Sequence, residues 1–254
     1  MTGVTRRAGI GASIARELGR AGARLFVTFF RRYDEQQVWG VDLNEPEQLL
    51  SELGSIADDV AGVELDLSLP ASPADLFRQA QQRLGHIDIL VNNAAHWEAG
   101  GIGDVGADQL DRHYAVNVRA PVLLCAEFAR QPKSNRPGRI INITSGQGHS
   151  AMPGNIAYAV TKAALDALTL TLSAELAGHG ITVNALDPGP TDTGWISDQL
   201  RLEILQASPD GKISSPEEVA RLVRHLSGDG AASITGQVIR AQGGGSAARV
   251  KGAG

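Results

Sequence analysis

The sequence has a single cysteine, few aromatic residues and no long apolar run. Cys125 has no partner for a disulfide, which is compatible with a reducing compartment, and its apolar neighbours predict a buried thiol. No stretch approaches the ~20 apolar residues that a membrane-spanning helix needs, and no charged segment followed by an apolar one has the pattern of a secretory leader. We therefore expect a cytoplasmic protein that does not bind membranes.

A basic surface and a metal-ligand pattern are also missing. The formal net charge is −5, and the 23 basic and 28 acidic residues are interspersed. No basic stripe is therefore available to neutralise the phosphates of a nucleic acid. The six histidines are scattered, and none pairs with a cysteine or carboxylate at the spacing of a metal site. We expect neither a nucleic-acid partner nor a bound metal.

The chain does contain a regular alternation of short apolar runs and longer amphipathic segments. The predicted strands are Arg24–Phe30, Gly62–Leu67, Ile87–Asn92, Arg139–Ser145, Ile181–Asp187 and Gln237–Ala241. The predicted helices are Gly11–Ala21, Pro73–Leu84, Ala107–Arg130, Ile156–His179 and Pro216–Leu226. Continuous apolar strands are covered on both faces, so the pattern predicts an α/β protein with a doubly wound parallel sheet in three layers, the Rossmann fold.

The length of 254 residues fits one large domain. We expect this domain to span residues 1–246 and a frayed tail, rich in glycine and alanine, to span residues 247–254. Two segments, 31–46 and 189–215, lack a clean period and are predicted to be long loops with room for short helices. Loops of this length usually carry function.

A glycine-rich segment leads directly into the first predicted helix. Gly3, Gly9 and Gly11 lie in the run Thr2-Gly3-Val4-Thr5-Arg6-Arg7-Ala8-Gly9-Ile10-Gly11. Such a turn lets backbone N–H groups and the helix dipole receive a pyrophosphate, because glycine allows the phosphate to approach the backbone. A purely structural turn explains the same glycines equally well.

Arginines cluster where a dinucleotide site distinguishes NADP from NAD. The strand predicted over Arg24–Phe30, which follows the glycine-rich segment and its helix, is followed by Arg31 and Arg32, and the first acid after it is Asp34. Arg6 and Arg7 lie in the glycine-rich segment itself. Guanidinium groups match the geometry of a phosphate, so the residues favour NADP(H) over NAD(H). For each arginine alone, an ordinary solvated surface position remains an alternative.

A tyrosine and a lysine lie four residues apart on the longest predicted helix. Tyr158 and Lys162 therefore share one face, where the ammonium favours the ionised phenol and is expected to lower its pKa. Ser145 ends a predicted strand at the edge where open α/β sheets bind ligands. Its hydroxyl can therefore reach the same substrate carbonyl as the Tyr158 phenol. Asn117 lies in a helical pattern that asparagine does not stabilise. An ordinary helix surface for the Tyr–Lys pair, and a packed asparagine, are the alternatives.

Together these residues resemble the classical short-chain dehydrogenase/reductase family, in particular 3-oxoacyl-ACP reductases, over essentially the whole chain. Asn92-Asn93-Ala94-Ala95 looks like the family's asparagine-rich turn, and Pro188 to Thr193 looks like the loop around the nicotinamide. Asp66 looks like the residue that holds the adenine ring. The resemblance implies that the cofactor is bound by Gly3, Thr5, Arg6, Arg7, Gly9, Ile10, Gly11, Arg31, Asp66, Leu67, Asn93, Ala94, Ala95, Tyr158, Lys162, Pro188, Gly189, Thr191 and Thr193.

The resemblance also implies an activity, the NADP(H)-dependent interconversion of a ketone and a secondary alcohol. Tyr158 would exchange a proton with the substrate oxygen, and Ser145 would hydrogen-bond that oxygen. Lys162 would bind the nicotinamide ribose and lower the Tyr158 pKa, and Asn117 would hold a water of the proton relay. A 3-oxoacyl thioester is the leading substrate, with sugar, steroid and xenobiotic ketones open, and a homotetramer is the expected assembly. A non-catalytic NADP(H)-binding sensor or scaffold, or a purely structural domain, is the alternative.

Two features depart from the family pattern. Five residues, Val4 to Ala8, separate Gly3 from Gly9, where three are usual. Only Met1 precedes Thr2, so the first strand, which belongs at the centre of the sheet, is almost entirely missing. Buried backbone groups without partners cost about 1 to 3 kcal/mol each. We therefore expect the working protein to extend upstream by several apolar residues.

Overall fold

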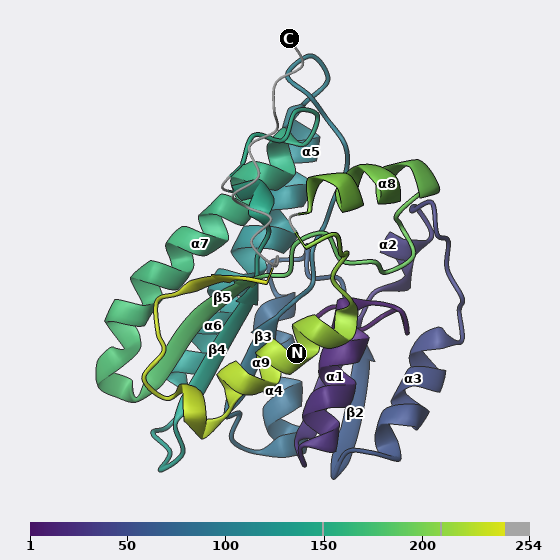
Figure 1. Ribbon diagram of the computed structural model, residues 1–254. Helices are drawn as coiled ribbons and strands as arrows, with labels where there is room; N and C mark the ends of the chain where they lie inside the picture. The colour runs from purple at the N-terminus through teal and green to yellow at the C-terminus, as the bar shows by residue number, and fades with distance from the viewer. Residues whose placement is uncertain (149, 209, 242–254) are drawn as a thin grey trace.

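The computed structural model (Figure 1) describes residues 1–148, 150–208 and 210–241. Its strands are β1 Arg24–Phe29, β2 Asp59–Glu64, β3 Ile89–Asn92, β4 Gly138–Ile143, β5 Ile181–Asp187 and β6 Val238–Arg240. Every pairing between these strands is parallel, as the continuous apolar runs predicted. β2 begins and ends three residues earlier than predicted. The tail predicted at residues 247–254 lies outside the described residues.

The helices surround the sheet in the predicted order. They are α1 Ile10–Arg20, α2 Arg31–Asp34, α3 Glu45–Gly54, α4 Ser72–Leu84, α5 Ala107–Tyr114, α6 Ala120–Arg130, α7 Ile156–Leu176, α8 Asp198–Ala207 and α9 Pro216–Ser227. A π-helical turn, η1 Ala115–Arg119, joins α5 to α6, so the helix predicted over 107–130 has three parts. Helix α3 was not predicted, because its period depends on only two fully buried leucines, Leu49 and Leu53.

Two apolar cores lie on opposite faces of the sheet and confirm the three layers. One core packs β-strand side chains such as Val91 and Ile141 against α1 and α9, which lie side by side over one face (Figure 1). The other core packs the neighbouring residues Leu90 and Ile140 against α4 and α6. Successive strand residues point to opposite faces, so a sheet covered on both sides needs apolar residues at every position. In the described part of the chain, no helix is long and apolar enough to cross a membrane.

The sheet is interrupted at its centre. Strands β2 and β1 form one part, and β3, β4, β5 and β6 form the other, in that order. Residues 1–4 lie between the two parts: Val4 N donates to Thr28 O at 2.7 Å, and Thr2 N donates to Val91 O at 3.1 Å. The first strand is therefore represented by a short stub in the expected central place.

Cys125 provides a test of the second core. It lies on α6, and its side chain is 1% exposed in the second core. Burial raises the pKa of its thiol to about 12. Only the thiolate reacts quickly with a disulfide reagent. We expect no labelling of Cys125 in the native protein and one equivalent after denaturation, measured by mass spectrometry. Rapid labelling without denaturant would contradict the buried position.

Candidate active site

Strand β4 and helix α7 are joined by a set of side-chain hydrogen bonds. The Lys162 Nζ donates to the Ile143 carbonyl at 2.8 Å, and the Thr144 hydroxyl donates to the Lys162 carbonyl at 3.2 Å. Further along, the Asn142 Nδ2 donates to Thr169 Oγ1 at 2.9 Å. All of these side chains are buried. Because buried hydrogen bonds are costly to leave unmade, they fix the position of α7 along β4.

This arrangement brings together the three residues predicted to carry the chemistry. Ser145 follows the end of β4, and its hydroxyl lies close enough to the Tyr158 phenol on α7 to act on its pKa. The Lys162 ammonium lies 5.5 Å from the centroid of the Tyr158 ring, over its face. Asp187, at the end of β5, acts electrostatically on both Tyr158 and Lys162. The predicted spacing of Tyr158 and Lys162 on one helix face is thus confirmed.

The pKa of Tyr158 differs from the expectation. Burial raises it above the ordinary value for tyrosine, and the hydrogen bond with Ser145 offsets this only in part. The Lys162 ammonium faces the ring and donates to the Ile143 carbonyl. Burial also lowers the pKa of Lys162 to about 8. Tyr158 is therefore protonated at neutral pH, the form that gives up a proton.

Asn117 lies in the π-helical turn η1 and is 1% exposed. Its Oδ1 accepts from the His96 N–H at 2.7 Å, and its Nδ2 donates to the His96 carbonyl at 2.9 Å and to Thr161 Oγ1 at 3.1 Å. These bonds hold the segment after Asn92–Ala95 against α7. Single π-helical turns inside α-helices are frequent at functional sites. The role of Asn117 as a water holder stays a prediction.

Three polar residues that the sequence did not mark, His113, Glu98 and Arg112, lie beside these side chains and His96. The His113 ring, fully buried, lies 6.5 Å from the Tyr158 ring and 4.9 Å from the His96 ring. The His96 Nε2 is 2.6 Å from a Glu98 oxygen, and Arg112 donates twice to the Glu98 carboxylate. The bonds from Arg112 lower the pKa of Glu98 to about 2. His113 precedes Asn117 by four residues on the predicted helix, and this spacing is the signal that could have identified it.

A cavity of about 450 Å³ opens where the carboxyl ends of β1 and β2 and the start of α1 meet. The predicted cofactor residues that line it are Gly3, Thr5, Arg6, Gly9, Ile10, Gly11, Asp66, Leu67, Asn93, Ala94, Ala95 and Thr193. Helix α1 begins without a side-chain cap, so N–H groups of its first turn are available to an anion. The cavity therefore fits the phosphates and adenosine of a dinucleotide. His96 also lines it and connects it, through the His113 ring, to Tyr158.

Two glycines allow the close contacts beneath this cavity. Gly3 has a φ of +74°, in the left-handed region, and its carbonyl accepts from the Asn93 Nδ2 at 2.9 Å. A Cβ on Gly11 would lie 2.2 Å from the Gly3 carbonyl oxygen, so no larger residue fits where α1 meets the loop. The Thr2 hydroxyl accepts from the N–H groups of Asn93 and Ala94. The glycine-rich segment and the asparagine-rich turn are thus one unit.

The four arginines separate into two pairs. The Arg31 guanidinium forms ion pairs with the carboxylates of Glu47 and Glu64. These ion pairs compete with its predicted contact with a cofactor phosphate. Arg7 is paired with Glu52 and, like Arg31, does not line the cavity.

Arg6 and Arg32 line the cavity near the start of α1, and Arg32 was not among the predicted cofactor residues. Arg6 also donates to the Thr193 carbonyl at 2.8 Å and lies over the Trp39 ring. The structure therefore favours Arg32 in the place given to Arg31.

The predicted nicotinamide loop lies beside the site but mostly outside the cavity lining. Gly189 has a φ of +64°, and its N–H donates to Asp187 Oδ1 at 2.9 Å. Thr191 is buried and donates to the carbonyls of Pro188 and Gly189. Only Thr193 reaches the cavity. Among the described residues, no cluster of three or more possible metal ligands is present.

Residues 3–246 match a family model described as enoyl-(acyl carrier protein) reductase. The chain belongs to the short-chain dehydrogenase/reductase family. An uncharacterized oxidoreductase of Bacillus subtilis, YjdA, is 39% identical over 246 residues, which cover 96% of this chain and 94% of the relative. The 3-oxoacyl-[acyl-carrier-protein] reductase FabG of Rickettsia felis is 33% identical over 93% of this chain and 92% of its own.

A solved structure of the angucycline C-6 ketoreductase LanV with bound NADP has a TM-score of 0.83 and 31% identity to this chain. The match covers 97% of this chain and 95% of that one. The predicted family and the Rossmann fold are confirmed, and with them the general class of oxidoreductase.

Asn117 gives a direct test of how the site is held. In the Asn117→Ala variant, the His96 peptide groups lose both partners, and each buried group left unpaired costs about 1 to 3 kcal/mol. We expect the free energy of unfolding in urea to fall by that order. Asn44→Ala, at an exposed asparagine that makes no capping bond, should leave it unchanged. Equal stabilities of the two variants would contradict the structural role of Asn117.

Proposed function

We propose that the protein is an NADP(H)-dependent oxidoreductase that interconverts a ketone and a secondary alcohol. The observation that carries this proposal is the grouping of Ser145, Tyr158 and Lys162 beside a cavity suited to a dinucleotide. A structural domain has no need of a buried lysine beside a half-buried phenol, because burying a lysine is costly. An acid–base reaction does need them.

Each residue has a definite task in the reduction. Bound NADPH supplies the hydride. The Tyr158 hydroxyl, protonated at neutral pH, donates its proton to the substrate oxygen, and the Ser145 hydroxyl holds that oxygen by a hydrogen bond. Lys162, with a pKa of about 8, lies near the phenol and stabilises the phenolate that this transfer leaves behind. In the oxidation, the same groups act in reverse.

The choice of NADP(H) rests on the two arginines in the cavity. Arg6 and Arg32 can pair with a ribose phosphate, which NAD lacks. The carboxylate that follows β1 in the cavity lining, Asp34, is buried and accepts from the Trp39 indole N–H at 2.8 Å. This carboxylate is therefore already engaged and is a poor partner for the ribose hydroxyls of NAD. The NADP in the LanV structure supports the same choice.

A 3-oxoacyl thioester is our leading substrate. The similarity to FabG, a 3-oxoacyl-[acyl-carrier-protein] reductase, supports this class, and the similarity to LanV supports a ketone more generally. The residues that we expect to select the substrate from the sequence are His96, Trp97, Gln147, His149 and the loop from Trp195 to Pro209. His149 and Pro209 lie outside the described residues.

A homotetramer is the assembly that we propose. Helices α5 and α7 carry large apolar side chains on the surface, among them Tyr114, Val160 and Leu170. Leu170 is 65% exposed and Val160 60% exposed. A face of this kind is typical of an interface between subunits, because a monomer gains nothing from exposing it.

Tyr158→Phe tests the proposed proton transfer. Because phenylalanine keeps the ring but lacks the hydroxyl, we expect ketone reduction to slow by roughly 10²- to 10⁴-fold. Binding of NADPH, measured by calorimetry, should be retained. Tyr114→Phe, at an exposed tyrosine, is the matched control and should keep full activity. Full turnover by the Tyr158 variant would refute the assignment.

Arg32→Ala tests the cofactor preference. Loss of one charge-assisted hydrogen bond should weaken NADPH binding by roughly ten- to hundredfold and leave NADH binding unchanged. Arg7→Ala, whose side chain pairs with Glu52 outside the cavity, should alter neither. If NADPH and NADH binding fell by the same factor in the Arg32 variant, the phosphate contact would be wrong.

A further inference from the structure

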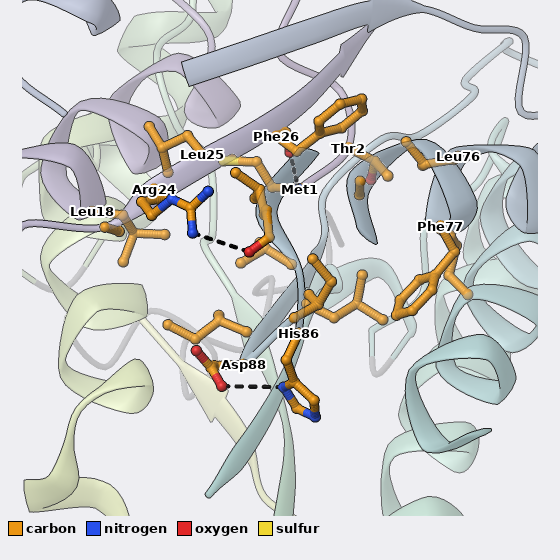
Figure 2. Close-up of a pocket in the computed structure, with 18 of the residues that line it drawn as sticks. Met1, Thr2, Leu18, Arg24, Leu25, Phe26, Leu76, Phe77, His86 and Asp88 are labelled. Atoms are coloured by element: carbon orange, nitrogen blue, oxygen red, sulfur yellow. Dashed lines mark hydrogen bonds and ion pairs between the residues drawn. The ribbon is translucent and has the colours of Figure 1, made fainter. Parts of the chain in front are cut away.

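Arg6 lies in the middle of a glycine-rich segment that is anchored at both ends. At its start, the Met1 nitrogen donates to Phe26 O at 2.7 Å, beside a cavity of about 400 Å³ that residues of β1 and β3 line (Figure 2). At its end, Gly9 N donates to Arg6 O at 3.0 Å and closes a turn directly before α1. The Arg6 side chain therefore extends from a backbone that is held in place.

The Arg6 guanidinium reaches the loop that follows β5. Its Nη2 donates to the Thr193 carbonyl at 2.8 Å. Both residues line the cofactor cavity, so this bond joins two segments that border the cavity. Gly194 lies against the same guanidinium: its φ is +89°, and a Cβ added there would lie 3.3 Å from the Arg6 Nη2. A glycine in the left-handed region thus lets the loop pass close to the guanidinium.

A tryptophan supports the guanidinium from the other side of the contact. The Arg6 Cζ lies over the Trp39 ring, 4.6 Å from its centroid. The Trp39 indole N–H donates to Asp34 Oδ1 at 2.8 Å, and Asp34 is buried. A guanidinium over the face of an indole is held by cation–π attraction and keeps its N–H groups for other partners. Trp39 therefore stabilises the orientation in which Arg6 meets the Thr193 carbonyl.

The loop that Arg6 holds is also tied to α8. Gly194 N donates to Asp192 Oδ1 at 3.0 Å, and the Asp192 carboxylate forms an ion pair with Arg201 of α8. Arg6 thus connects the glycine-rich segment to the loop and, through Asp192, to the helix that follows it.

We propose that Arg6 is a positioning residue that clasps the loop carrying Thr193 over the bound dinucleotide, and that the clasp opens when the dinucleotide enters or leaves. This inference rests on the proposed function, which gives the glycine-rich segment to the phosphates and residues 188–193 to the nicotinamide. A dinucleotide that spans both segments lies against the bond that joins them. While the bond is made, the nicotinamide loop is held in place and the dinucleotide is retained.

The clasp is separable from the proposed phosphate contact of the same arginine. A guanidinium has several N–H donors in a fixed fork, and the bond to Thr193 uses only Nη2. The other nitrogens are available to a ribose phosphate. NADH lacks that phosphate, so any effect of Arg6 on NADH reports the clasp alone.

The test measures how fast NADH leaves and enters the cavity, by stopped-flow fluorescence with excess NADP⁺ as the displacing ligand. Arg6→Met keeps the apolar stem and removes the donors, so we expect NADH release to accelerate by roughly ten- to hundredfold. NADH association should also become faster, because the clasp no longer has to open first. A general loss of structure would slow association.

Three further variants complete the comparison. Arg6→Lys keeps a charged donor and should restore part of the slow release. Trp39→Leu should accelerate release, and adding it to Arg6→Met should change little more, because both act on one contact. Arg7→Met, at the neighbouring arginine that pairs with Glu52 outside the cavity, should release NADH at the wild-type rate.

The proposal is overturned if NADH leaves the Arg6→Met variant as slowly as the wild type, or if association slows while release accelerates. It is also overturned if Arg7→Met accelerates release as much as Arg6→Met. With reduction by NADPH intact in the wild type, any of these results refutes the clasp alone. A wild-type protein that binds neither NADH nor NADPH refutes the proposed function and the clasp with it.

Discussion

The hydrogen bonds between helix α7 and strand β4 are the constraint on which the site depends. Lys162 uses its ammonium to hold the Ile143 carbonyl, and Thr144 returns a bond to the Lys162 backbone. A shift of α7 by one residue would break both bonds inside an apolar core and separate Ser145 from the Tyr158 phenol. The lysine thus has a structural task as well as a chemical one. Its low pKa is a consequence of the burial that this double task requires.

The strands and the placement of Tyr158 beside Lys162 could be predicted because their signals are local. A strand covered on both faces is apolar at every position, and Tyr158 and Lys162 share a helix face by their spacing alone. The contacts of Arg31 could not be predicted in this way. Its carboxylate partners, Glu47 and Glu64, come from α3 and β2, and no local pattern joins these three positions.

The prediction that the pKa of Tyr158 is lowered was wrong for a related reason. Spacing indicated an ammonium near the phenol but not how deeply both would be buried, and burial is the larger effect. The contact between the His96 and His113 rings could not be predicted, because it forms between the asparagine-rich turn and α5, two segments that meet only in the fold. The sequence thus indicates which of these residues lie together, whereas their ionisation and the residues around them depend on packing.

The account's central claim is that the group around Tyr158 carries out reduction of a carbonyl with NADPH. The most direct measurement uses NADPH labelled with deuterium at the reactive carbon of the nicotinamide, together with a panel of 3-oxoacyl thioesters and simple ketones. Mass spectrometry of the product alcohol should find the label on the former carbonyl carbon, in wild type and not in Tyr158→Phe. A protein that binds NADPH but transfers label to no member of the panel would contradict the account.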